Sequence, residues 1–335
     1  MSILLAADFA LSRTDLLKFV AVAAFAVGIA ALLRVFRSRS IVGPLRWSLG
    51  SPLWPVVIGA ALATFAWLGV QTAYATFVAA HFGQSHPGPH SLEEMLTPAD
   101  YAVLSTVPGL VGFLVLLVTD YALSPQLPAQ LGLAPQRALD GLVKGIFASL
   151  VILPLVFCGA VLLEVFYNAI HYKPPGAHEL LLVMQATDNP IIRSILIVGA
   201  CAIAPACEEY LFRGHLQTIL VRLFHPDHLI PVAPPPSSIP DPALALSDGP
   251  AVLHYPAPMY QRIPHERSPI RIWLAVVVTS ILFALIHPLW MAPLIFVLSL
   301  GLGYAYERTG NLWTNIFIHA LFNTANTFLF LHSSM

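Results

Sequence analysis

The stretch PIIRSILIVGACAIAPACEEYLFRG, residues 190–214, begins as an apolar helix and ends in a segment with three charges. A charge at the centre of a bilayer helix costs about 2.5–3.5 kcal/mol, so such charges usually face a protein interior and have a function. Glu209 and Arg213 are four residues apart with the acid first, the favourable order for an ion pair on a helix. Glu208 points about 100° away from Glu209. One glutamate is therefore neutralised locally while its neighbour stays available. The alternative is a helix end at the water interface, where these charges cost little.

The composition indicates the environment in which the whole chain folds. The 335 residues are 57% hydrophobic and 10% charged, whereas a soluble domain has about 25% charged residues. This excess predicts a polytopic membrane protein whose surroundings are a lipid bilayer. Net charge is −1, so no nucleic-acid partner is implied. The cysteines 158, 201 and 207 lie in apolar runs without ligand spacing and are interpreted as packing residues.

Apolar runs predict the fold class, an all-α membrane bundle of about eight transmembrane helices. A span needs about 20 apolar residues. The runs lie near 16–36, 53–80, 101–123, 139–166, 190–223, 271–288, 291–306 and 311–331. No internal repeat is visible, which weakens a transporter interpretation.

Lysine and arginine in the loops predict the orientation. The first, third, fifth and seventh loops hold most of these residues, among them Arg34, Arg37, Arg137, Arg222 and Arg308. We therefore expect those loops to be cytoplasmic. This gives an integral, multi-pass protein of a bacterial cytoplasmic membrane with both termini outside. The fourth loop, with Lys173 and Arg193, blurs the pattern without reversing it.

One segment departs from the membrane composition. Residues 225–269 are rich in proline, as in VAPPPSSIPDPA, and lack helical periodicity. We expect a polyproline-prone or disordered cytoplasmic loop here. Because it joins the fifth and sixth spans, we expect it to be dispensable for the fold and able to gate a site from the cytoplasmic side.

Two further spans carry polar residues. The sixth ends SILFALIHP, which places His287 after a long apolar helix, and the eighth contains NIFIHALFN, with His319 and Asn323 on one face. A lone membrane histidine is more often a packing residue than a catalyst. Three helices that each offer such groups predict that Glu208, His287, His319 and Asn323 converge on one cavity.

These three stretches resemble a known family. EEYLFRG (208–214), FALIH (283–287) and HALFN (319–323) are similar to the ordered motifs EExxxR, FxxxH and HxxxN of the CPBP intramembrane proteases. That family includes CAAX prenyl endopeptidases and the lysostaphin-resistance-protein-A-like, or Abi, proteins. The resemblance covers residues 130–331, interrupted by the proline-rich loop. Residues 1–129 are expected to form N-terminal transmembrane helices outside this core.

The resemblance implies an intramembrane endopeptidase. Glu208 would activate the hydrolytic water and His287 would assist as a second base or proton shuttle. His319 and Asn323 would hold the oxyanion of the tetrahedral intermediate, while Glu209 and Arg213 would support the geometry. The chemistry agrees with the residue types, because peptide hydrolysis needs a general base and donors aimed at the developing oxyanion.

Cofactor and substrate stay open at this point. One glutamate and two histidines also form the ligand set of a catalytic zinc, so Glu208, His287 and His319 are the alternative zinc ligands. The absence of HExxH favours a metal-free enzyme. The partner is expected to be a membrane-embedded or membrane-anchored peptide, and CAAX-type processing is one option. The alternative function is a non-catalytic membrane scaffold, binding or immunity protein in which the same polar cluster is structural.

Overall fold

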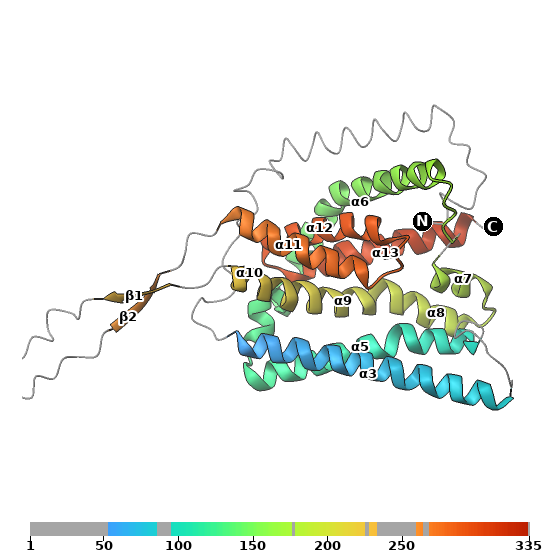
Figure 1. Cartoon of the computed structure of the whole chain (residues 1–335), viewed down its shortest axis with the longest axis horizontal. Helices are drawn as coiled ribbons and strands as arrows, with labels where there is room; N and C mark the ends of the chain where they lie inside the picture. Colours follow the sequence, from blue (N-terminus) through green and yellow to red (C-terminus); the bar gives the residue numbers. More distant parts are fainter. Residues whose placement is uncertain are drawn as a thin grey trace, which may run out of the picture.

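The structure is a computed structural model that describes residues 53–85, 95–175, 178–224, 228–232, 259–263 and 268–333. It is an all-α bundle with one attached strand pair (Figure 1). The longer helices are α3 (Trp54–Ser85), α5 (Pro98–Leu123), α6 (Ala138–Ala169), α11 (Pro269–Leu285), α12 (Ala292–Thr309) and α13 (Leu312–Ser333). The shorter helices and turns are η2 (Ala129–Leu133), η3 (Pro135–Arg137), α7 (Glu179–Ala186), α8 (Pro190–Val198), η4 (Gly199–Ile203), α9 (Ala204–Glu209), η5 (Tyr210–Gln217) and α10 (Thr218–Phe224).

The expected spans agree with these helices. The span 16–36 lies outside the described residues, and every later one coincides with a helix: α3, α5, α6, the run from α8 to α10, α11, α12 and α13. By length and composition, four stretches of the described chain can cross a membrane: Trp54–Phe82, Pro98–Leu123, Ala129–Ala169 and Pro190–Phe224. A shorter apolar helix, α11, has 17 residues.

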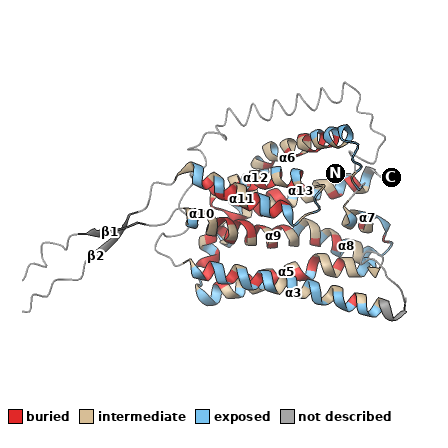
Figure 2. Ribbon diagram, in the orientation of Figure 1, coloured by how far each residue is buried: buried red, intermediate tan, exposed pale blue. Residues whose placement is uncertain are grey.

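The run from α8 to α10 lies inside the bundle. It packs against α5 on one side and against α11 and α13 on the other (Figure 1). Buried side chains gather where α9, α11 and α12 meet (Figure 2), and Phe212, Phe283 and Leu298 belong to the main apolar cluster there. The side chains of Glu209 and Arg213 are 0% exposed. The alternative of a charged helix end at the water interface is therefore wrong.

Proline 205 does not break this run. The chain passes from α8 through the π-helical turn η4 into α9, and the Ala204 N–H donates to the Gly199 carbonyl, five residues back. In the same five-residue register, the backbone N–H of residue 205 would donate to the Ala200 carbonyl. Residue 205 is a proline and has no N–H. The Ala200 carbonyl therefore lacks its donor from residue 205.

The proline-rich loop contains a pair of short strands near its two ends. This corrects the expectation that 225–269 is a polyproline-prone or disordered loop. Strands β1 (His228–Val232) and β2 (Met259–Ile263) pair antiparallel, with His228 opposite Ile263 and Val232 opposite Met259. In a two-stranded sheet each strand is an edge, where proline is tolerated, so Pro231 does not prevent pairing. Residues 233–258 lie outside the described residues. The strand pair leaves the bundle beside α10 and α11, whereas α7 lies at the other end (Figure 1).

Close contact between α6 and α13 depends on a glycine. A Cβ at Gly141 would lie 3.0 Å from the Thr314 backbone N and closer still to the Trp313 Cβ, whereas a Cβ at Gly69 in α3 would meet nothing within 4 Å. We therefore predict that Gly141→Ala lowers the stability of the protein in detergent by about 1–3 kcal/mol through overpacking. Gly69→Ala is the matched control and should be neutral or slightly stabilising. Thermal unfolding of both variants tests this, and equal melting temperatures would contradict the close packing.

Candidate active site

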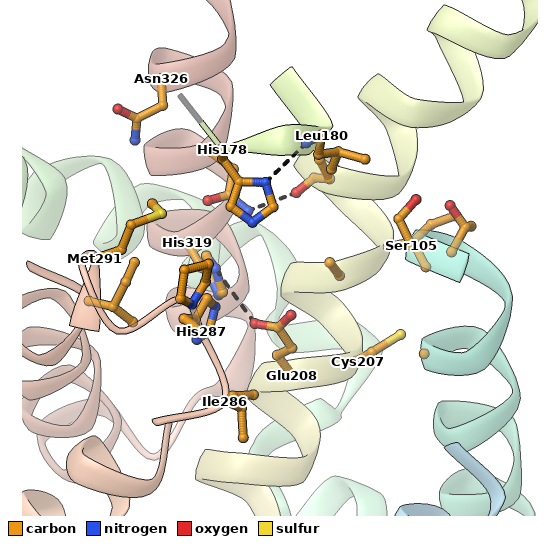
Figure 3. A pocket seen from close by; sticks show the side chains of 18 of the residues that line it. Ser105, His178, Leu180, Cys207, Glu208, Ile286, His287, Met291, His319 and Asn326 are labelled. Carbon is orange, nitrogen blue, oxygen red and sulfur yellow. Dashed lines mark hydrogen bonds and ion pairs between the residues drawn. The ribbon is translucent and has the colours of Figure 1, made fainter. Parts of the chain in front are cut away.

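A cavity of about 410 Å³ lies between α3, α5, α9, α13 and the connection from α11 to α12. Glu208, His287, His319 and Asn323 all belong to its wall. Figure 3 shows the carboxyl group of Glu208 facing the two histidine rings. The structure thus brings together four side chains from α9, α13 and the connection that follows α11, as the convergence predicted from the sequence requires.

Glu208 has an uncommitted carboxylate oxygen. Its side chain is 16% exposed, and among the described residues its Oε2 has no hydrogen-bond partner. The nearest ion-pair partner is His319, whose Nε2 lies 3.9 Å from that oxygen. This distance is too long for a direct hydrogen bond. Oε2 of Glu208 is thus a buried acceptor without a donor among the described residues.

Glu209 is fully committed to neighbours. Its Oε1 accepts from Arg213 Nη1 at 2.8 Å and its Oε2 accepts from Asn315 Nδ2 at 3.4 Å. Arg213 Nη2 donates to Ser299 Oγ at 2.6 Å, and the guanidinium lies 4.4 Å from the centre of the Phe283 ring. The local ion pair expected from the i, i+4 spacing is present.

Glu209 also orients His319. The Nδ1 atom of His319 lies 2.9 Å from Glu209 Oε1, and a carboxylate can only accept, so Nδ1 carries the proton of this bond. The other ring nitrogen, Nε2, then faces Glu208. A carboxylate behind a histidine ring fixes both its tautomer and its orientation.

His287 is held just beyond the end of α11. Its Nδ1 lies 2.8 Å from the Phe283 carbonyl oxygen, which can only accept, so Nδ1 donates. In the neutral ring, Nε2 is therefore a proton acceptor. The Phe283 ring packs against both histidines, with centroid distances of 4.9 Å to His287 and 5.8 Å to His319. Phe283 thus sets the spacing of the two imidazoles.

Asn323 is anchored by the irregular backbone of the 190–224 run. Its Nδ2 donates to the Ala200 carbonyl at 2.7 Å. This is the carbonyl that Pro205 leaves without its π-register donor. One N–H of the amide holds the side chain in place, and its second N–H stays available to a ligand. Asn326 also lines the cavity.

The alternative zinc ligands do not form a preformed site. Within the described residues, no group of three or more His, Cys, Asp or Glu side chains is arranged to hold a metal ion. Glu208, His287 and His319 share the cavity wall without gathering as a ligand set. We therefore derive no step of the chemistry through a metal.

The sequence motifs did not indicate several residues of the cavity wall. Gln71 of α3, Ser105 and Thr106 of α5, and His178 before α7 line the same cavity. Isolated polar residues in apolar helices are the only sequence signal for the first three. They lie before the segment that carries the motifs, so the N-terminal helices take part in the site.

A second polar cluster lies apart from the cavity. Asp120 of α5 accepts from the Tyr210 hydroxyl and lies 3.0 Å from His215 Nε2. All three residues are buried, and none belongs to the cavity wall. The cluster joins α5 to η5 and has a structural role.

The cavity lies toward one end of the bundle. α5 contributes residues of its first half, 104–109, and the 190–224 run also contributes its first half, 200–208. α13 contributes residues from its middle onward, from His319 to Thr327. This end carries the second and sixth loops, which hold no lysine or arginine, and the fourth loop, which holds Lys173 and Arg193. The strand pair of the proline-rich loop is at the other end (Figure 1), and no described residue of that loop belongs to the cavity wall.

Comparison with known proteins supports the motif assignment. Residues 190–325 match the family model described as Rce1-like, type II CAAX prenyl endopeptidase. This segment includes all three motifs, and the match supports endopeptidase activity in general. No curated protein and no solved structure matches the chain significantly.

The two adjacent glutamates should respond differently to the same substitution. Glu209→Gln leaves the Arg213 charge buried without its carboxylate, and breaking a buried pair costs about 3–5 kcal/mol. Glu208→Gln removes no hydrogen bond that the described structure shows at Oε2, so its unfolding should resemble that of the wild type. Thermal unfolding in detergent measures both. Equal destabilisation by the two variants would contradict the division of roles.

Proposed function

We propose that this chain, which carries an Rce1-like domain of the type II CAAX prenyl endopeptidases, is an intramembrane endopeptidase that cleaves a membrane-associated peptide. The observation that carries the proposal is the contrast between the two glutamates. Glu209 is neutralised by Arg213, whereas Glu208 lies in the wall of the cavity and its buried Oε2 has no hydrogen-bond partner among the described residues. A carboxylate in that position is a general base for water.

The reaction begins with a water held near Glu208. Glu208 takes a proton as the water oxygen attacks the peptide carbonyl carbon, and the carbonyl oxygen becomes an oxyanion. Asn323 donates its second N–H to that oxyanion. His319 donates from Nε2 when both of its ring nitrogens carry protons, while Glu209 accepts from Nδ1.

His287 completes the proton transfer. With Nδ1 donating to the Phe283 carbonyl, its Nε2 accepts the proton from Glu208 or from the attacking water. The imidazolium then protonates the leaving amine as the C–N bond breaks. Glu209 and Arg213 act through His319 and Phe283 by holding their positions, and they do not touch the reacting atoms.

The substrate side follows from the position of the cavity. With arginine-rich loops in the cytoplasm, the cavity end of the bundle faces outward in a bacterial cytoplasmic membrane, as do both termini. This placement favours a peptide anchored in the outer leaflet over a cytoplasmic CAAX protein.

Glu208→Gln should abolish hydrolysis while the protein stays folded, because the amide is nearly isosteric but is not a base. We expect turnover to fall by at least about a hundredfold. The assay uses purified protein in liposomes with a panel of membrane-anchored quenched-fluorescent peptides, including a farnesylated CAAX peptide. Wild-type turnover by the variant would contradict the assignment of the base. Cleavage of none of the panel by the wild type would favour the scaffold alternative.

The orientation has its own test. We predict that alkaline phosphatase fused to the C-terminus is active and that a green fluorescent protein fused after Ala245 is fluorescent. Each reporter works only on the predicted side of the membrane. The reverse pattern would turn the cavity toward the cytoplasm, where a CAAX substrate would be accessible.

A further inference from the structure

His178 lines the cavity but belongs to none of the three motifs. It precedes α7, in the connection between α6 and the 190–224 run, and lies outside the segment matched by the family model. Figure 3 shows its ring above those of His319 and His287, over the same cavity as Glu208. It is therefore an additional imidazole at the proposed site, held by a different element.

The tautomer of His178 is fixed by the backbone. The Leu180 N–H donates to His178 Nδ1 at 3.2 Å, in the N-cap of α7. A ring nitrogen that accepts a hydrogen bond cannot carry a proton, so the proton of the neutral ring is on Nε2. In Figure 3 this second nitrogen points into the cavity, toward His319 and His287.

The surroundings keep the ring neutral. Burial lowers the pKa of His178. Protonation of Nδ1 would also remove the acceptor of the Leu180 N–H. The cavity thus holds a neutral N–H donor.

In the proposed reaction, no other polar group of the site donates to the substrate carbonyls beside the cleaved bond. Glu208 and Nε2 of His287 offer acceptors, while Asn323 and His319 serve the oxyanion in the proposed reaction. A peptide backbone has further carbonyl oxygens on either side of the cleaved bond. A neutral donor suits a neutral acceptor, because neither group brings an uncompensated charge into the cavity.

We propose that His178 is a substrate-binding residue whose Nε2–H donates to a backbone carbonyl of the peptide, next to the bond that is cleaved. The inference rests on the proposed endopeptidase function. The hydrogen bond orients the peptide across the cavity and is present before and during the reaction, so its loss should raise KM more than it lowers kcat.

The variant His178→Asn separates this role from capping. Asparagine is a favoured N-cap whose side-chain oxygen can accept the Leu180 N–H, but its side chain is too short to bring a donor to the position of Nε2. We expect an unchanged melting temperature, a KM raised about threefold to tenfold and a kcat within about twofold of the wild type. Unchanged KM in this variant would overturn the proposal and leave His178 as a helix cap.

Thr97→Ala is the matched control. Thr97 caps α5 through a bond from the Asp100 N–H and lies outside the cavity wall. Its removal should lower the melting temperature without changing KM. An equal rise of KM in Thr97→Ala would show that KM responds to changes away from the cavity, and this would also overturn the proposal.

A binding measurement distinguishes this inference from the proposed function. Fluorescence anisotropy of each labelled peptide of the panel is compared between Glu208→Gln and the double variant Glu208→Gln, His178→Asn, neither of which turns over. Weaker binding by the double variant, by about threefold to tenfold, supports the inference even if no cleavage is found. Equal binding overturns the inference alone. Absence of both binding and cleavage in all proteins overturns the inference together with the proposed function.

Discussion

The buried ion pair between Glu209 and Arg213 is the interaction on which the arrangement of the site depends. Both side chains are fully buried and 2.8 Å apart. An isolated charge at this depth would cost several kcal/mol, so each group must be satisfied by neighbours from other helices. Ser299 of α12 and Asn315 and His319 of α13 provide those bonds. The pair therefore draws α12 and α13 to the run that carries Glu208 and aligns His319 beside it.

Irregular backbone segments position the other two side chains of the site, Asn323 and His287. Pro205 follows a π-helical turn, and the Ala200 carbonyl that lacks its donor holds Asn323 instead. His287 lies past the last turn of α11, where the Phe283 carbonyl fixes its ring. Side chains that must face a reacting molecule are thus fixed by backbone groups that a regular helix would have used internally.

Much of this could be predicted from the sequence, because membrane helices are strongly constrained by composition and length. The long helices after residue 52 and the Glu209–Arg213 pair followed from apolar runs and i, i+4 spacing, whereas the short helix α7 was not expected. The hydrogen bond from His319 to Glu209 joins residues 110 positions apart, and helical periodicity carries no information about such a contact. The β1–β2 pair was missed because proline content suggested a loop, although two edge strands tolerate Pro231. His178 gave no signal, since a single histidine in a connecting segment resembles an ordinary cap.

The central claim is that Glu208 acts as a base toward water and does not attack the peptide itself. The most direct test is a single turnover in H₂¹⁸O, with enzyme in excess over a peptide that it cleaves, followed by mass spectrometry of the product and of the peptide that contains Glu208. The account predicts one ¹⁸O in the new carboxylate of the product and none in Glu208. Product that contains only ¹⁶O, together with ¹⁸O in the Glu208 carboxylate, would show a covalent acyl intermediate and would contradict it.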